Sequence, residues 1–265
     1  TSEQRSFSRF LQTENGIRVE LNMKLLYDIL SAQTACADRG IGRYSLDLGL
    51  AMQAELEKQG GKLRALAYDF MPGRILSLRR NFGYGNVDII HFHKKDAWER
   101  LKAPWARTAA CLVEDVYRNT DADAMYVSMP IESPPDLMGL PMDYQKTGKF
   151  TAGTFYDLVP LLFPEHYNCD EGYRKSLERT KTLDLLLAIS ENTRQDLIEH
   201  LGIAPERVVN IGSGVSHIFK EKEIQDREVI LERYGVHRDF VMYTGGSDWR
   251  KNQDGLIRAW ACLPE

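Results

Sequence analysis

The stretch Leu185–Val215, LLLAISENTRQDLIEHLGIAPERVVNIGSGV, contains the pattern that decides the fold. It opens with the apolar run Leu185–Ile189, which predicts a buried strand. Ser190 then fits the N-cap of a helix over Asn192–Leu201, and the glycine that follows fits the end of that helix. A second strand is predicted at Arg207–Ile211. Strand, helix and strand in this order indicate two parallel strands joined by a crossover helix.

The same alternation continues on the amino-terminal side of this stretch. Further strands are predicted at Met23–Leu30, Leu63–Tyr68, Val87–Phe92, Ala124–Met129 and Phe150–Phe155. Helices are predicted at Arg43–Lys58, Ala106–Asn119 and Tyr173–Leu183. The rest of residues 69–106 is less regular, and residues 130–148, with four prolines, are predicted to be loop. The predicted fold is therefore α/β, a Rossmann-like parallel sheet with helices on both faces. Such sheets bind ligands at the carboxyl ends of their strands.

The sequence divides into four regions. They are an extension or linker (1–22), an N-terminal Rossmann-like domain (23–219), a highly charged linker (220–238) and the truncated start of a C-terminal domain (239–265). In the last region, Phe240–Tyr243 predicts a strand, and a helix is predicted from about Gln253. One strand and one helix cannot bury a core, so we expect this chain to be a fragment of a longer protein.

Composition and charge narrow the class of protein. The chain has 265 residues, 43% of them hydrophobic and 27% charged, as in ordinary soluble globular proteins. A formal net charge of −4 gives no overall attraction to nucleic acid. The four cysteines lie far apart and no ligand pattern surrounds His91 and His93, so neither a metal nor a cofactor is expected. No bilayer-length apolar run and no signal peptide is present, which predicts a cytoplasmic protein.

The first candidate binding motif is Gly40-Ile41-Gly42-Arg43, between the first strand and the first helix. Glycines let the backbone approach a ligand closely, and a helix N-terminus offers N–H groups to an anion such as a diphosphate. The match to the GxGxxG fingerprint is poor, because Ser45 stands where the third glycine would fall. A plain structural turn is an equally good interpretation of these residues alone.

Two more motifs follow predicted strands. Tyr156 and Asp157 could form hydrogen bonds with sugar hydroxyls; alternatively, Asp157 caps a turn that Pro160 fixes. Ser190 favours the N-cap role already described, which Thr193 or Glu191 can support. A ligand contact from Ser190 or Glu191 would be an additional role.

Basic residues form the last two candidate sites. Arg250 and Lys251 follow a glycine pair, and the planar fork of an arginine beside the point charge of a lysine suits a diphosphate. Residues 74–107 hold eight Lys or Arg and three Asp or Glu, a local charge of +5. Such a patch could bind anionic lipid or a lipid-diphosphate acceptor at the inner face of the plasma membrane. A solvated charged surface is the alternative for both. The residues chosen for the patch are Arg79, Arg80, Lys94, Lys95 and Trp98.

Four segments resemble family 4 of the retaining glycosyltransferases, the group-1 type. Gly40–Tyr44 is similar to the glycine loop of that family, and TFYDLVPLLFPEHY at Thr154–Tyr167 is similar to its central YDLIPL segment. Leu185–Val215 is very close to a third family segment. FVMYTGGSDWRKNQDGLIRAW at Phe240–Trp260 resembles the opening of the family's donor domain, in a variant seen among bacterial mannosyltransferases. The resemblance covers residues 23–265, and the last two segments are the specific ones.

The resemblance implies a GT-B fold, with the acceptor in the N-terminal domain and the nucleotide sugar in the C-terminal domain. Arg250 and Lys251 would contact the donor diphosphate, and Gly42 would approach it from the other side. Tyr156 and Asp157 would lie near the reacting sugar and are the predicted catalytic residues. The implied reaction is retaining transfer of a hexose, with mannose from GDP-mannose favoured, to a cell-surface glycan or lipid-linked acceptor, without an obligatory metal.

The chain departs from the family pattern at two positions. Tyr156 replaces a histidine found in many members, and a tyrosine cannot act as an acid or base near neutral pH without a large pKa shift. Assistance by the leaving diphosphate is therefore expected. Gly246 stands where many members have arginine, so Arg250 is expected to take that role. The family's paired-glutamate segment, E-x7-E, would lie beyond residue 265, so residues 1–265 alone are expected neither to bind the donor tightly nor to turn over.

Two other functions compete with this reading of the sequence. The alternative from another class is a non-catalytic acceptor-binding or scaffold module of a multidomain polysaccharide synthase. A nicotinamide-dependent Rossmann enzyme is disfavoured, because the strand that ends at Tyr68 is not preceded by a complete glycine fingerprint.

Overall fold

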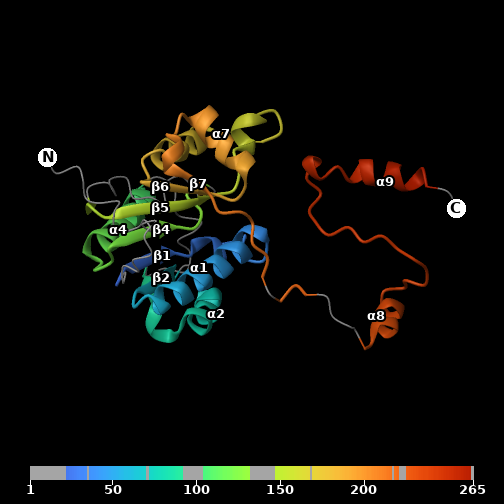
Figure 1. Cartoon of the computed structure of the whole chain (residues 1–265), viewed down its shortest axis with the longest axis horizontal. Coiled ribbons are helices and arrows are strands. Elements are labelled where there is room, and N and C mark those ends of the chain that lie inside the picture. Colours follow the sequence, from blue (N-terminus) through green and yellow to red (C-terminus); the bar gives the residue numbers. More distant parts are fainter. Residues whose placement is uncertain are drawn as a thin grey trace, which may run out of the picture. The chain divides into compact units, whose positions relative to one another are not determined.

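The computed structural model describes residues 22–34, 36–69, 72–91, 104–131, 147–167, 169–216, 218–220 and 225–263, with residues 104–110 described by their backbone alone. The chain divides into two compact units, Thr1–His217 and Ile218–Glu265. Figure 1 shows that the labelled strands belong to the first unit, whereas the second carries the helices α8 and α9.

The first unit is built on a seven-stranded sheet in which, among the described residues, every pairing is parallel. The strand order is β3-β2-β1-β4-β5-β6-β7, so the order reverses direction between β1 and β4 (Figure 1). The strands are β1 (Lys24–Asp28), β2 (Lys62–Tyr68), β3 (Val87–Ile90), β4 (Ala124–Val127), β5 (Phe150–Phe155), β6 (Leu185–Ala188) and β7 (Val208–Asn210). The predicted α/β, Rossmann-like fold class is confirmed.

Helices cover both faces of this sheet. The helices are α1 (Gly40–Lys58), α2 (Pro72–Phe82), α4 (Pro104–Asn119), α5 (Val159–Leu162), α6 (Glu171–Thr180) and α7 (Glu191–Leu201). On one face, Leu56 of α1 and Phe82 of α2 are buried with Leu25 of β1. On the other face, α4, α6 and α7 contribute to the core that contains Leu26. Because consecutive residues of β1 are buried on opposite faces, its sequence is a continuous apolar run, as expected of a parallel strand.

Several elements differ in their bounds from the sequence prediction, and the differences at α1, β1 and α5 bear on the site. α1 begins at Gly40 and not at Arg43, so the predicted glycine loop is the first turn of a helix. β1 ends at Asp28, because the Asp28 carboxylate accepts the N–H of Leu30 (2.9 Å) and turns the chain into the 3-10 segment Leu30–Ala32. α5 follows β5 within a segment that sequence analysis treated as a turn, and its proline occupies the first helical turn.

The helix α2 lies in a region predicted to be irregular. Its residues Leu78 and Phe82, four positions apart, are buried against the core on the α1 face. Three arginines interrupt this apolar period, which explains why the sequence pattern did not indicate a helix. Phe92, at the end of one predicted strand, and residues 132–146 of the predicted loop lie outside the described residues.

The second unit contains α8 (Arg227–Arg233), the 3-10 segment Trp249–Lys251 and α9 (Gln253–Ala261). The predicted helix from Gln253 is confirmed, and the Oδ1 atom of Asn252 caps it by accepting the N–H of Gly255 (3.2 Å). The strand predicted at Phe240–Tyr243 is wrong: these residues are exposed and unpaired as a strand. A strand needs a neighbouring strand, and the described part of this unit offers none. No helix in the described ranges combines the length and apolarity needed to cross a bilayer.

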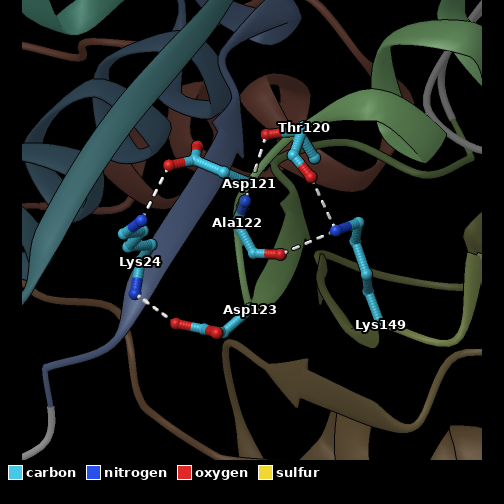
Figure 2. Close-up of polar contacts among 6 residues, drawn as sticks. All are labelled: Lys24, Thr120, Asp121, Ala122, Asp123 and Lys149. Carbon is cyan, nitrogen blue, oxygen red and sulfur yellow. Dashed lines mark hydrogen bonds and ion pairs between the residues drawn. The ribbon is translucent and has the colours of Figure 1, made fainter.

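A polar cluster at the amino edge of the sheet fixes the turn that precedes β4 (Figure 2). The Nζ atom of Lys149 donates hydrogen bonds to the backbone oxygens of Thr120 (2.7 Å) and Ala122 (2.9 Å). The Nζ atom of Lys24 lies 2.7 Å from Oδ2 of Asp121, and both of these side chains are more than half exposed. The first lysine therefore satisfies backbone acceptors, whereas the second forms a surface ion pair.

We expect Lys149→Met to lower the free energy of unfolding by about 1–2 kcal/mol, because two backbone carbonyls lose their donor. Lys24→Met is the matched control, and its effect should be much smaller because solvent screens the exposed ion pair. Urea unfolding followed by circular dichroism measures both. Equal losses in the two variants would show that the backbone contacts of Lys149 carry no special stability.

Candidate active site at the carboxyl edge of the sheet

The candidate site lies where the strand order reverses. Chains leaving β1 and β4 turn toward opposite faces of a sheet at such a point, which opens a crevice at the carboxyl ends of the strands. Ser31 follows β1 and Ser128 follows β4, and their hydroxyl oxygens are 2.8 Å apart. Both side chains are fully buried. This hydrogen bond joins the segments that follow β1 and β4 at the point where the strand order reverses.

The segment after β1 is held by Gln33, whose side chain pairs with the backbone of β2. Its amide nitrogen donates to the carbonyl of Tyr68 (2.9 Å), and its amide oxygen accepts the N–H of the same residue (2.8 Å). The N–H of Gly42, in the first turn of α1, donates to the carbonyl of Cys36 (3.1 Å). The Cys36 loop therefore lies directly on this turn.

Two of the predicted diphosphate ligands differ sharply in their surroundings. A Cβ atom on Gly42 would lie 2.4 Å from the carbonyl oxygen of Cys36 and 2.5 Å from Cα of Ala37. A Cβ atom on Gly40 would meet nothing within 4 Å. Arg43 is exposed on α1. Glycine is thus required at position 42 by the packing of the loop, which supports the structural interpretation of the motif without testing the ligand role.

Tyr156 and Asp157, predicted side by side as catalytic residues, both line the hollow described below, but they form different hydrogen bonds. The hydroxyl of Tyr156 lies 2.7 Å from the hydroxyl of Ser45 in α1 and can donate to the carbonyl of Ser128 (3.3 Å). The ring of Tyr156 packs edge-on against Tyr44, with centroids 5.9 Å apart and planes at 80°. The tyrosine is therefore directed at α1.

Asp157 lines a hollow beside the ends of β4 and β5. The hollow has about 310 Å³ of empty space, which includes open solvent. Its lining residues are Met129, Pro130, Ile131, Thr154, Phe155, Tyr156, Asp157, Pro160 and Tyr173. The Oδ1 atom of Asp157 also accepts the N–H of Val159 (3.1 Å), so the predicted turn cap is present. Asp157 therefore both caps the turn and lines the hollow.

Ser190 is the N-cap of α7, as predicted, because its hydroxyl accepts the N–H of Thr193 (3.1 Å). The hydroxyl of Thr193 in turn donates to the carbonyl of Tyr156 (2.9 Å). Glu191 contacts Arg194 (3.1 Å) and Asn210 (3.2 Å) through its two carboxylate oxygens. These contacts join the ends of β5, β6 and β7 into one network.

A buried carboxylate lies beneath the site at the end of β1. Burial raises the pKa of Asp28 from 3.8 to about 6, and the hydrogen bonds from Tyr68, Leu30 and Tyr117 oppose this rise. The Tyr117 hydroxyl lies 3.3 Å from the Oδ2 atom of Asp28, and the Tyr68 hydroxyl donates to the same atom. Burial also raises the pKa of both tyrosines.

The other predicted site residues lie apart from this network or outside the described residues. Arg79 is half-buried and Arg80 exposed on α2, whereas Lys94, Lys95 and Trp98 fall in a range that the structure does not describe. Arg250 and Lys251 belong to the second unit. There, the guanidinium of Arg250 contacts both carboxylate oxygens of Asp248, at 3.0 and 3.4 Å.

No group of three or more potential metal ligands occurs in the described ranges. A reaction without an obligatory metal stays a prediction.

Sequence reasoning missed Ser45 and Ser128 as members of this network. Ser45 and Ser128 are fully buried, and Thr193 nearly so. Small hydroxyl residues at such positions carry no spacing signal, because their partners come from strands and helices far away in the sequence. Thr193 was predicted to support the Ser190 cap, and the three-residue interval between them is typical of a capping turn. Its hydrogen bond to the Tyr156 carbonyl was not predicted.

The first unit is a Rossmann-like parallel sheet with polar groups at its carboxyl edge, and this fold is shared with a solved structure. The crystal structure of Anabaena HepE in complex with UDP-glucose shares this fold, with a TM-score of 0.59 and 18% sequence identity. The match covers 91% of this chain and 58% of HepE.

Sequence comparison adds named relatives. The chain is 29% identical over 256 residues to the serotype-specific mannosyltransferase WbdA of Escherichia coli, a match that covers 91% of this chain and 30% of WbdA. It is 26% identical over 115 residues to the O-antigen chain mannosyltransferase B of Escherichia coli, covering 42% of this chain and 30% of that protein. The chain thus spans under a third of the length of these relatives. No protein-family model matches it.

Proposed function

We propose that the protein containing this chain is a glycosyltransferase that moves a hexose from a nucleotide sugar to a glycan or lipid-linked acceptor. The observation that carries this proposal is the similarity to WbdA along 91% of the chain, combined with a GT-B sheet whose carboxyl edge bears the predicted motifs. The relatives are named mannosyltransferases, which favours mannose, with GDP-mannose as the proposed donor. Retention of configuration is proposed from the family-4 resemblance.

The hollow beside β5 is the proposed site of the acceptor sugar. Its wall includes two prolines and Phe155, and Asp157 supplies a carboxylate. Sugars present apolar ring faces and hydroxyl donors, so an apolar wall beside a carboxylate is complementary to them. In the second unit, Arg250 and Lys251 are the proposed diphosphate ligands, with Asp248 already holding the Arg250 guanidinium.

Peripheral membrane contact is proposed for α2. This helix has three basic residues and no acidic one, and its Leu76 is 48% exposed. Arg74 is ion-paired with Asp38, which leaves Arg79 and Arg80 as the groups proposed to meet anionic lipid headgroups.

The test is transfer by the complete protein from radiolabelled GDP-mannose, with UDP-glucose and dTDP-glucose as comparison donors. Lipid-linked oligosaccharide acceptors are supplied in neutral or anionic vesicles. We expect mannose transfer, faster on anionic vesicles. Arg250→Ala and Asp157→Asn should each lower kcat/KM by about 10²-fold or more, the first through the donor and the second through the acceptor. Transfer from no nucleotide sugar would reject the proposal, and acceptor binding without transfer would favour the scaffold alternative.

Residues 1–265 alone are proposed to bind the donor weakly and not to turn over. The support is that Arg250 lies in a unit whose described residues form no sheet and leave large apolar side chains such as Trp260 exposed. Calorimetric titration of the 265-residue chain with GDP-mannose tests this, and tight binding would refute it.

A further inference from the structure

Tyr156 lies at the strand end where a catalytic residue was predicted, but its hydroxyl contacts other parts of the fold. Its hydroxyl lies within hydrogen-bonding distance of three groups: the Ser45 hydroxyl (2.7 Å), the Ser128 carbonyl (3.3 Å) and the Ile41 carbonyl (3.5 Å). Ser45 and Ile41 belong to the first two turns of α1, and Ser128 follows β4. The hydroxyl therefore joins the amino-terminal end of a helix to the ends of two strands.

Both ends of this connection are fixed. On the strand side, the Thr193 hydroxyl donates to the backbone carbonyl of Tyr156 itself (2.9 Å), so α7 holds the tyrosine in place. On the helix side, Ser45 is fully buried, and its carbonyl accepts the hydroxyl of Tyr27 from β1 (2.8 Å). A shift of the Tyr156 hydroxyl would leave the buried Ser45 hydroxyl without this contact, which is costly in a protein interior.

The helix end that Tyr156 holds is the one expected to meet the donor. The N–H groups in the first turn of a helix have no acceptor within that helix, and they carry partial positive charge. In α1, the N–H of Gly42 is already used by Cys36, so Gly40 and Ile41 present the remaining groups of this turn. Their direction depends on how firmly the first two turns are held.

We propose that Tyr156 is a positioning residue, which acts through Ser45 to hold the amino-terminal end of α1 in the orientation that receives the donor diphosphate. This inference rests on the proposed function. It replaces the expectation that Tyr156 takes part in the chemical step. It assigns recognition of the acceptor to Asp157, which lines the hollow, and organisation of the donor side to Tyr156.

The experiment compares three variants of the complete protein. Tyr156→Phe keeps the ring and removes the hydroxyl, and Ser45→Ala removes its partner. Each should raise KM for the nucleotide sugar about tenfold, the effect of one lost buried hydrogen bond, while kcat stays within about threefold. KM for the acceptor and the pH profile of kcat should not change. The double variant should be no worse than either single variant, because both remove the same interaction.

Tyr126→Phe is the matched control. Tyr126 is buried on the α1 face of the sheet, but its hydroxyl bonds to Thr154 and not to α1. It should leave KM for the donor unchanged. An equal rise of that KM in Tyr126→Phe would mean general loosening of the fold and would overturn the proposal. A loss of kcat of about 100-fold in Tyr156→Phe at unchanged donor KM would overturn it too, because the hydroxyl would then act on the reacting atoms.

Amide hydrogen exchange separates this proposal from the proposed function. Exchange of residues 40–46 should be faster in Tyr156→Phe and Ser45→Ala than in the unmodified protein, and unchanged in Tyr126→Phe. If no nucleotide sugar is turned over but exchange follows this pattern, the proposed function fails while the anchoring of α1 stands. If exchange in this segment is the same in all variants, the anchor is refuted whatever the activity.

Discussion

Gly42→Ala is expected to lower the free energy of unfolding by about 3 kcal/mol and Tm by about 9 °C. The new Cβ atom would lie 2.4 Å from the Cys36 carbonyl oxygen and 2.5 Å from Cα of Ala37. Both are backbone atoms, so no side-chain rotation relieves the clash. The Cys36 loop must move away, and the hydrogen bond from the Gly42 N–H to the Cys36 carbonyl weakens with it.

Gly40→Ala is the matched control for this change. It adds the same methyl group in the same helical turn, at a position where a Cβ atom has no neighbour within 4 Å. Its effect should stay within about 0.5 kcal/mol, as for exposed substitutions elsewhere. Differential scanning calorimetry of the two variants measures the change in Tm and in the free energy of unfolding. If Gly42→Ala is as stable as Gly40→Ala, the close approach of the loop is not a constraint, and the glycine would have to be explained by a ligand.

The second large effect is a dependence of the free energy of unfolding on pH, which arises from Asp28. Its pKa is raised to about 6 in the folded protein, against 3.8 for an unperturbed aspartate. Between these values the folded chain binds more protons than the unfolded chain, so stability falls as pH rises. The full loss, reached above pH 6, is about 3 kcal/mol at 1.36 kcal/mol per pKa unit. Below pH 3.8 both states are protonated and the loss disappears.

Asp28→Asn removes this ionisation. The variant has a constant offset from its altered hydrogen bonds to Tyr68 and Tyr117, but no titration at this position. The difference in unfolding free energy, variant minus wild type, should therefore increase by about 2–3 kcal/mol from pH 4 to pH 7.5. Urea unfolding at several pH values measures it, with the exposed Asp47→Asn as control for the lost charge. A difference that is flat with pH would contradict the raised pKa.

Tyr117→Phe is a second, independent test of the raised pKa of Asp28. The Tyr117 hydroxyl favours the ionised form of Asp28, so its removal should raise the pKa of Asp28 further. The fall in stability should still begin near pH 3.8, but it should continue to a higher pH and become larger in total.

The sheet was predictable because its strands are buried on both faces and their apolar runs need no partner to be recognised. α7 was predictable in detail, since Ser190 and Gly202 mark its ends; Gly202 has the left-handed φ of 66° typical of a helix C-cap. α2 was missed because arginines interrupt its buried positions. The strand at Phe240–Tyr243 was wrongly predicted, because β-propensity cannot show whether a neighbouring strand exists.

The site was predictable in its location but not in its contacts. Strand ends in a parallel sheet necessarily meet at one edge, so Asp157 and Ser190 could be placed there from sequence alone. The direction of Tyr156 could not be foreseen. It depends on Ser45, more than a hundred positions earlier, and on the packing of α1 against the sheet.

The pairing of Gln33 with the backbone of Tyr68 affects the whole segment after β1. The side-chain amide meets the Tyr68 backbone as one peptide group meets another, with one donor and one acceptor. It extends the β1–β2 pairing beyond the point where the main chain has already turned away. Glutamate would place a second acceptor against the Tyr68 carbonyl, and asparagine is shorter by one methylene. Hydrolysis of this side-chain amide to glutamate, with release of ammonia, would therefore turn an attractive contact into a repulsive one. Deamidation at position 33 would thus weaken the attachment of the loop that packs on α1.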